Sequence, residues 1–388
     1  MKNHYLFSQP HQPFFVLAFL NAIVSMFIFM LLFKGLVASE ILSINYHTYS
    51  FIFLMFTPAF LAFLFTTFPR FSATDPINQT HYMYVFWLFL AGSLLFQISI
   101  FTSMILLVLS VIITFIAHVG AVYILVDIYK KSNVTEKSDQ TWIIIAMLAG
   151  LTSHMIFFIS IWLPILHQFS IQLAIYLYLF LLVFTIAQRM VPFFSHSPIE
   201  KHTERFQVIV GLLGLHVLLE STQIHSSFLA DSLLAYLIGK ELYRWKLPFP
   251  NENPLVWILH ISLFWIPIAF ALSAITNLIS LSSGTNFLSL GIHVLTLGFF
   301  VTILIGFGTR ITLGHSSNSM YADKLTVILF YWTQVVVFTR ILTSFAAATN
   351  WSFVVLFDLS ITVWIVLFAL WGSRFFAVLI FGKKLKSK

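Results

Sequence analysis

The chain is a succession of long apolar runs separated by short polar segments. Many runs reach about 20 residues, the length at which a helix crosses the hydrocarbon core of a bilayer. They are continuous, whereas the strands of a membrane barrel alternate over about 10 residues. The pattern predicts an all-α polytopic membrane helix bundle. The twelve expected transmembrane helices are 14–34, 47–68, 82–98, 104–129, 141–163, 168–190, 206–222, 227–244, 254–280, 287–309, 322–345 and 351–380.

The basic residues support this count. If the N-terminus is cytoplasmic, 18 of the 20 Lys and Arg residues fall in alternate loops or in the tail, which leaves only Lys34 and Arg340. Basic residues concentrate on the cytoplasmic side of membrane proteins, so both termini are predicted to be cytoplasmic. We expect one transmembrane domain over residues 1–388, a basic cytoplasmic tail at 381–388, and no clear internal repeat.

Composition restricts the chemistry. Sixty per cent of the residues are hydrophobic and 9% are charged, whereas soluble domains carry roughly 25% charged residues. The net charge of +7 therefore indicates cytoplasmic loops and gives no reason to expect nucleic acid. The chain has no cysteine, which excludes iron–sulfur clusters, thiolate-ligated heme and thiolate copper sites. Any metal must use histidine, methionine or oxygen ligands.

The chain has 14 histidines, and an imidazole inside a membrane indicates function because its burial is costly. Imidazole is also the commonest metal ligand in proteins. Seven histidines are expected in or beside spans, at depths that allow an outer and an inner centre: His47, His118, His154, His216, His260, His293 and His315. None of the deep ones share a helix at i,i+3 or i,i+4 spacing, so a metal site must combine several helices. For any single histidine, a hydrogen bond to a neighbouring helix is an equally good explanation.

Three arginines stand out by position. Arg189 and Arg310 end the sixth and tenth predicted spans at the inner rim, where a guanidinium could bind a heme propionate. Plain anchoring at the cytoplasmic surface explains both equally well. Arg340 lies near the outer end of the eleventh span, and pairing with Asp358 on the next span is favoured over a propionate or proton-path role.

Three carboxylates lie near predicted span ends, namely Asp127, Glu220 and Asp231. Acidic groups in such places can form a proton entry into a membrane protein. Solvation at the membrane interface is the simpler explanation for them.

Short motifs lie at the ends of the predicted spans. They read GIHVLTLG at 291–298, TRITLGH at 309–315, RMVPFF at 189–194, PFF at 13–15 and WILH at 257–260. Together with His154, these segments cover about residues 10–320 and resemble the NnrS family. That family comprises membrane proteins that contain heme and copper and are linked to nitric oxide metabolism.

The resemblance implies a multi-pass protein of the bacterial cytoplasmic (inner) membrane that holds heme b, with copper as a further option. It implies that nitric oxide, or a related small ligand, binds there as part of a nitric oxide response, of protection against nitrosative stress, or of denitrification. The lipid bilayer is the other expected partner. The expected ligands are His47, His154, His260, His293 and His315, with Arg189 and Arg310 as propionate partners.

The sequence departs from the family pattern at two motifs. The family's Trp-His-x-His-Glu motif reads YHTYS at 46–50, so His47 remains but Tyr49 replaces the second histidine. The family's Gly-His-Thr-Gly-Arg motif reads GHSSN at 314–318. If the missing histidine binds copper in relatives, this chain holds heme alone or has a weaker copper site.

Two other functions stay open at this point. One is a heme-copper type reductase of nitric oxide or oxygen that takes electrons from quinol, although the chain lacks paired histidines on one span. The other is a secondary transporter of twelve helices, in which Pro58, Pro164 and Pro267 break helices near a central site. The sequence assigns no catalytic residue and leaves open whether the protein is an enzyme.

Overall fold

A computed structural model describes residues 4–197, 203–222 and 224–385 of the chain. The described residues are helical and contain no strand, which confirms the predicted all-α class. Within these described residues, ten helices are long and apolar enough to cross a membrane, so the chain is a multi-pass membrane protein. Four residues of the predicted charge pattern lie outside the described residues: Lys2, Lys201, Lys386 and Lys388.

The chain forms two compact units. The first contains α1 (His11–Phe33), α2 (Ser43–Tyr49), η2 (Ser50–Phe56), α3 (Thr57–Phe71), α4 (Gln79–Ser99), α5 (Met104–Lys131), α6 (Ser138–Ser160), η3 (Pro164–Leu166) and α7 (His167–Gln172). The second contains η4 (Leu173–Phe180), of which the first two residues belong to the first unit, with α8 (Leu181–Phe194), α9 (Thr203–Ser221), α10 (Phe228–Arg244), α11 (Pro254–Ser283), α12 (Leu290–Val294), η5 (Leu295–Val301) and α14 (Lys324–Thr349). Helices α13 (Thr302–His315) and α15 (Phe353–Phe381) each contribute to both units.

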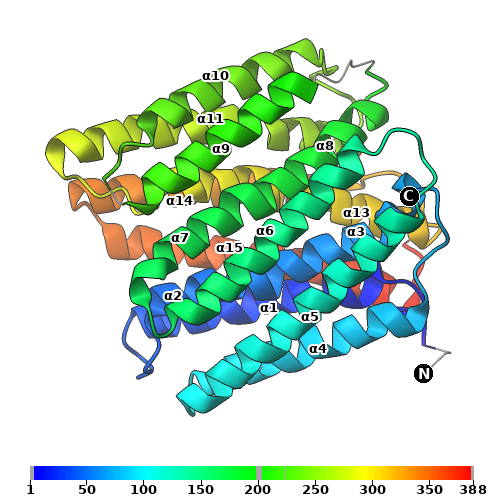
Figure 1. Cartoon of the computed structure of the whole chain (residues 1–388), viewed down its shortest axis with the longest axis horizontal. Coiled ribbons are helices and arrows are strands. Elements are labelled where there is room, and N and C mark those ends of the chain that lie inside the picture. Colours follow the sequence, from blue (N-terminus) through cyan, green and yellow to red (C-terminus); the bar gives the residue numbers. More distant parts are fainter. Residues whose placement is uncertain (1–3, 198–202, 223, 386–388) are drawn as a thin grey trace. The chain divides into compact units, whose positions relative to one another are not determined.

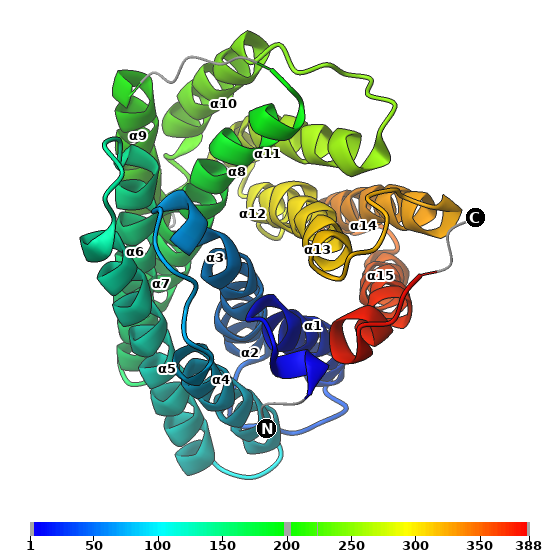
Figure 2. The ribbon, with the colours of Figure 1, turned by 90° about the vertical axis from the view of Figure 1, so that its right-hand side faces the viewer.

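Neighbouring helices within each unit pack side by side. In the first unit α4 lies along α5, and α1 lies against α3 (Figures 1 and 2). In the second unit α10 lies along α11. The single domain over residues 1–388 stays a prediction.

Helices α9 and α10 are the predicted seventh and eighth spans, but neither is among the ten candidate spans of the described chain. The count of twelve spans and the cytoplasmic position of both termini therefore stay predictions. Helices α9 and α10 follow one another in the chain. Whether both cross the membrane or neither does, every other loop stays on the side of the membrane predicted for it.

The structure reveals a repeat that we did not expect from the sequence. Three spans share one succession, in which a short α-helix leads into a π-helical segment and then into a second α-helix. They are α2–η2–α3, α7–η4–α8 and α12–η5–α13. When each succession is counted as one long helix, the order from α1 to α15 divides into three consecutive sets of four, and one of these successions stands second in each set. They are also the most buried candidate spans, at 94, 83 and 83% of their apolar stretch, whereas no other exceeds 61%.

Side-chain hydroxyls accompany two of these π-helical segments. Thr57 donates to the carbonyl of Ile52 at 2.8 Å, and Thr302 donates to that of Leu297 at 3.0 Å. Both bonds reach back five residues, the spacing of a π-helix, and short π-helical insertions frequently mark functional sites. Pro58, the next residue, has no backbone N–H and therefore cannot donate a helical hydrogen bond.

Glycines allow α12, η5 and α13 to pack closely on α11. A Cβ atom on Gly291 would lie 2.5 Å from the Cβ of Ser273, and one on Gly298 would lie 2.6 Å from Cγ of Trp265. Trp265 cannot move away easily, because its indole N–H donates to Gln334 at 2.7 Å. The close packing of η5 on α11 therefore requires a glycine at residue 298.

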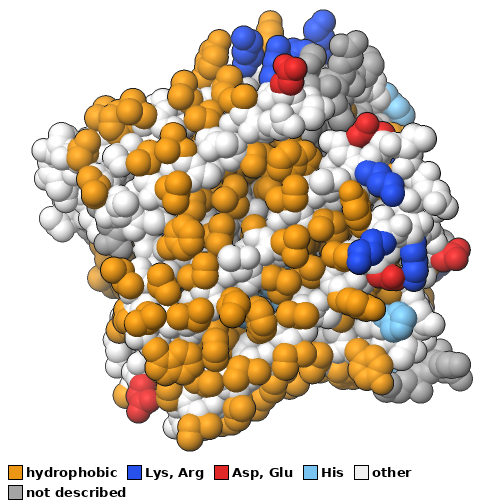
Figure 3. All heavy atoms as spheres, in the orientation of Figure 1, with side chains coloured by type: hydrophobic (Ala, Val, Ile, Leu, Met, Phe, Trp, Pro, Cys, Tyr) orange, Lys and Arg blue, Asp and Glu red, His pale blue; other side chains and the backbone are white. Residues whose placement is uncertain are grey.

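The face seen in Figure 3 is covered by hydrophobic side chains along the lengths of α4, α5 and α6. On these three helices Tyr84, Leu94, Ile105, Tyr123 and Met155 are exposed. Charged side chains gather toward the helix ends. This distribution is that of a surface in contact with lipid tails.

We predict that Gly298→Ala destabilises the protein by about 1–3 kcal/mol, since the new methyl group overpacks against Trp265. Gly211→Ala on α9 is the control, because nothing lies within 4 Å of its added Cβ. Thermal unfolding in detergent measures both variants. Equal midpoints for the two variants would contradict the packing argument.

Candidate heme and metal centres

A buried cluster in the first unit joins Tyr49 at the end of α2, His118 on α5 and His154 on α6. The hydroxyl of Tyr49 lies 3.0 Å from Nε2 of His154, and Nδ1 of His154 lies 3.4 Å from Nδ1 of His118. All three side chains have no exposed surface. The residue that replaces the family's second histidine is thus in direct contact with an expected ligand.

Aromatic rings enclose this cluster. Phe53 stacks on the His154 ring at a centroid distance of 4.0 Å and an interplanar angle of 18°. Phe115 meets the same ring edge-on at 5.4 Å, and Phe157 lies 5.0 Å from the ring of Tyr49. Such an apolar shell excludes water, so the polar atoms of the cluster depend on one another for hydrogen bonds.

The cluster can work in two ways. As a hydrogen-bonded chain, Tyr49 donates to Nε2 of His154, whose Nδ1–H donates to His118. As a metal site, the two Nδ1 atoms stand about as far apart as two ligands of one tetrahedral ion, for which bonds of about 2.0–2.1 Å give roughly 3.3 Å. Among the described residues, no group of three or more His, Cys, Asp or Glu could hold a metal ion. The pair by itself therefore offers two ligand nitrogens, fewer than the three or four protein ligands of a typical tetrahedral metal site.

A second histidine pair in the first unit joins the start of α1 to the end of α13. The rings of His11 and His315 lie 4.9 Å apart. Nδ1 of His315 lies 2.6 Å from Oε1 of Gln9, so this nitrogen donates and Nε2 carries the lone pair. Arg70 is close enough to act electrostatically on His315. Arg310 lies on α13, one turn and a half before His315.

His11 itself was not expected to be buried. It begins α1, is only 2% exposed, and its Nδ1 finds no hydrogen-bond partner among the described residues.

His260 on α11, in the second unit, is fully buried. The hydroxyl of Ser195 donates to the carbonyl of Val191 at 2.7 Å, and its oxygen lies 2.6 Å from Nε2 of His260. Ser195 has a single hydrogen, so its oxygen accepts from Nε2–H. Nδ1 of His260 then carries a buried lone pair, which has no partner among the described residues.

His293 on α12 contacts Arg340 on α14. Its Nδ1 lies 3.0 Å from the carbonyl of Ser289 and 3.1 Å from Nη2 of Arg340. Arginine only donates, so Nδ1 can accept from Arg340 or donate to Ser289 but cannot do both. Arg340 also donates to the carbonyl of Leu288 and to the hydroxyl of Ser344. The expected pairing of Arg340 with Asp358 stays a prediction.

Two expected residues remain, His47 and Arg189. His47 packs between the rings of Phe29 and Phe51, with centroids 4.4 and 4.8 Å away. Arg189 is half-buried on α8, in the second unit.

Sequence reasoning proposed His154, His260 and His315 as ligands, which stays a prediction, and it missed some of the residues that lie against them. His118 was recognised as deep but not as a ligand, and Tyr49 was seen only as a lost histidine. His11 stands between Pro10 and Pro13, a pattern typical of a turn. The isolated histidine in the apolar run around His118 was the available signal for that residue.

The fold and these buried histidines define a multi-pass membrane protein with several candidate ligand nitrogens. A heme-copper terminal oxidase dimer known from cryo-electron microscopy has a similar fold, with a TM-score of 0.57 and 12% sequence identity over 97% of this chain and 84% of that chain. No curated protein matches the sequence. The NnrS protein family model matches residues 5–381, and the chain belongs to that family.

We predict that Tyr49→His raises the copper that the purified protein retains, because the new imidazole would stand beside Nε2 of His154, where the hydroxyl of Tyr49 now lies, and would give a copper ion two imidazole ligands there. Tyr49→Phe should leave copper low, since it removes the hydroxyl without supplying a nitrogen. Metal analysis after copper loading and dialysis measures both variants. Equal copper in Tyr49→His and the unaltered protein would show that residue 49 does not complete the site.

Proposed function

We propose that this protein is a membrane-embedded heme protein that binds nitric oxide and contributes to the nitric oxide response and to protection against nitrosative stress. Membership of the NnrS family and a fold like that of a heme-copper oxidase support this proposal. The observation that carries the proposal is the hydrogen bonding of the ring nitrogens of His260 and His315. Each histidine has one ring nitrogen held by a protein oxygen, which leaves the lone pair on the other nitrogen, and that nitrogen of His260 is buried without a partner among the described residues.

A hydrogen bond on one ring nitrogen orients a ligating histidine and makes its other nitrogen more basic. Ser195 does this for His260, and Gln9 does it for His315. The residues present therefore fit a heme, and His260 or His315 would hold its iron. Heme iron with an open axial position supplies the binding of nitric oxide. Arg310, and also Arg70, are proposed to bind propionates.

The histidines then have defined tasks. They hold the group at a fixed orientation, and at His260, which is fully buried near the ring of Phe249, the surrounding chain also excludes water. Of the other expected ligands, His293 has a comparable contact, since its Nδ1 lies 3.0 Å from the carbonyl of Ser289, and His47 is kept as a proposal. Arg189 likewise remains a proposed propionate partner.

Copper is proposed only as a second occupant, at His118 and His154. Two imidazoles bind a copper ion less strongly than three, and Tyr49 contacts His154 at the nitrogen that faces away from His118. The proposal therefore puts heme first and a weak copper site second.

The second candidate function is a heme-copper type reductase of nitric oxide or oxygen that accepts electrons from quinol. The oxidase-like fold favours it. The incomplete copper pair weighs against it. We place either function in the bacterial cytoplasmic membrane, as the family membership suggests.

Absorption spectra of the detergent-purified protein test the proposal, recorded oxidised, reduced and reduced with nitric oxide, with metal analysis of the same sample. We expect stoichiometric heme and a shift of the heme bands on addition of nitric oxide. Protein that lacks heme after expression with ample heme supply would refute the proposal. Heme together with stoichiometric copper and turnover with quinol would favour the reductase.

Substitutions then identify the ligands. We predict that heme content falls sharply in His260→Ala, in His315→Ala, or in both. If His260 is a ligand, Ser195→Ala should weaken heme binding by roughly 10- to 100-fold, the usual effect of removing the partner of a ligating histidine. His81→Ala, at an exposed site on α4, is the control. Heme retention like that of the control in all three variants would remove both histidines from the assignment.

A further inference from the structure

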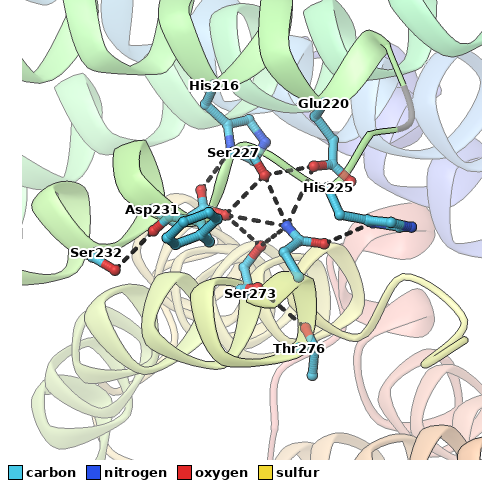
Figure 4. A network of polar contacts seen from close by, with 10 residues as sticks. His216, Glu220, His225, Ser227, Asp231, Ser232, Ser273 and Thr276 are labelled. Atoms are coloured by element: carbon cyan, nitrogen blue, oxygen red, sulfur yellow. Dashed lines mark hydrogen bonds and ion pairs between the residues drawn. The ribbon is translucent and has the colours of Figure 1, made fainter. Parts of the chain in front are cut away.

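A buried network of polar side chains joins three helices of the second unit (Figure 4). Its members are His216 and Glu220 of α9, Ser227 and Asp231 at the start of α10, and Ser273 and Asn277 of α11. His216 and Asp231 have no exposed surface. The explanation of Asp231 by solvation at the membrane interface is therefore wrong, because the chain surrounds this carboxylate completely.

Asp231 fixes the orientation of the His216 ring. Its Oδ1 lies 2.5 Å from Nδ1 of His216. A carboxylate only accepts, so Nδ1 carries the hydrogen and the lone pair lies on Nε2. The other carboxylate oxygen, Oδ2, accepts from the hydroxyl of Ser273 at 2.9 Å, which holds Asp231 in place from a third helix. Histidines that bind metals are typically held in this way, by a carboxylate on the ring nitrogen that faces away from the metal.

The second ring nitrogen of His216 is left without a task by this network. Nε2 is buried and has no hydrogen-bond partner in the described part of the chain. A buried polar atom without a partner is costly. The hydroxyl of a serine or tyrosine could donate to Asp231 without burying a second nitrogen. The arrangement therefore indicates that Nε2 is kept for a ligand.

Aromatic side chains flank the His216 ring. The ring of Tyr176 lies 4.0 Å from it, and the ring of Phe270 meets it edge-on at 6.4 Å. Tyr176 is the fourth residue of η4, and Phe53, which stacks on His154 at 4.0 Å, is the fourth residue of η2. Two π-helical segments thus place an aromatic ring against a buried histidine at the same position, and such segments frequently mark functional sites.

The chemistry around Nε2 favours heme over a bare metal ion. No group of three or more His, Cys, Asp or Glu among the described residues could hold a metal ion, and both oxygens of Asp231 already accept hydrogen bonds. A heme brings four nitrogens of its own, so one imidazole from the protein can attach its iron. The flat rings of Tyr176 and Phe270 suit the apolar faces of a porphyrin.

This position is separate from His260, which is one of the two histidines proposed above to hold heme iron. Asp231 contacts α11 at Ser273, which lies between three and four helical turns after His260. These two levels of α11 are about 20 Å apart along the helix axis. One iron therefore cannot bind both His216 and His260.

We propose that Nε2 of His216 is an axial ligand of a heme centre separate from His260, with Asp231 as the positioning residue on the opposite ring nitrogen. This inference rests on the proposed heme-binding function and adds a second centre to it. The charge of Asp231 draws the Nδ1 hydrogen toward itself and makes Nε2 a stronger electron donor. Asp231 should therefore stabilise ferric iron at this centre more strongly than the hydroxyl of Ser195 does at His260.

Heme content and absorption spectra of the full-length protein test this centre, in detergent and after expression with ample heme supply. We expect His216→Ala to lose one heme per chain, and free imidazole added during heme reconstitution to restore it, because imidazole can occupy the place of the deleted ring. His225→Ala is the control, since it removes another ring of the same network, which contacts Asn277. Heme loss without rescue by imidazole would assign His216 a structural role and overturn the proposal.

Asp231→Asn tests the positioning role through the reduction potential, which a purely structural contact would not change. The amide can still accept from Nδ1 but carries no charge, so the potential of one heme should shift upward in a redox titration followed by absorption. Ser232→Ala on the same helix should leave the potential unchanged, because the hydroxyl of Ser232 donates to the carbonyl of Phe228. Equal potentials in these two variants would contradict the role of Asp231.

The outcomes separate this inference from the proposed function. Unaltered protein that holds no heme would refute both. Unaltered protein that holds heme, together with His216→Ala that keeps the heme content and spectrum of the control, would refute the centre at His216 and leave the proposed function standing.

Discussion

The structure depends on one constraint, which is that the apolar interior of a membrane protein offers an imidazole no water to bind. Each buried ring must find its partners in other helices. His154 bonds to Tyr49 and His118, His260 bonds to Ser195, and His216 bonds to Asp231. These contacts orient the rings and determine which nitrogen is left to bind a ligand or a proton.

The same constraint acts on the backbone. A π-helical segment shifts hydrogen bonds from one carbonyl to another, and the chain tolerates this only where the affected groups are satisfied within the protein. The three π-containing spans meet this condition because they are the most buried ones, and Thr57 and Thr302 supply extra donors. Tyr49 immediately precedes one of these segments, so the repeat and a candidate site share the same span.

Apolar run lengths were sufficient to predict an all-helical membrane protein, because helix length against bilayer thickness is a local property of the sequence. The repeat was missed because a π-helical turn leaves no compositional mark. Helices α9 and α10 stay ambiguous for a physical reason, since they carry polar residues such as Glu220 and Asp231 that lower their hydropathy. The pairing of His11 with His315, or of His118 with His154, follows from packing between distant segments, which periodicity cannot reveal.

The partner on the first ring nitrogen separates His216 from His260. Both rings keep one buried nitrogen with a lone pair. His216 donates to a carboxylate oxygen of Asp231, whereas His260 donates to the hydroxyl of Ser195, which offers only a dipole. A proton at His260 would leave a charge with little compensation in an apolar site, so that ring is better suited to bind a metal while neutral.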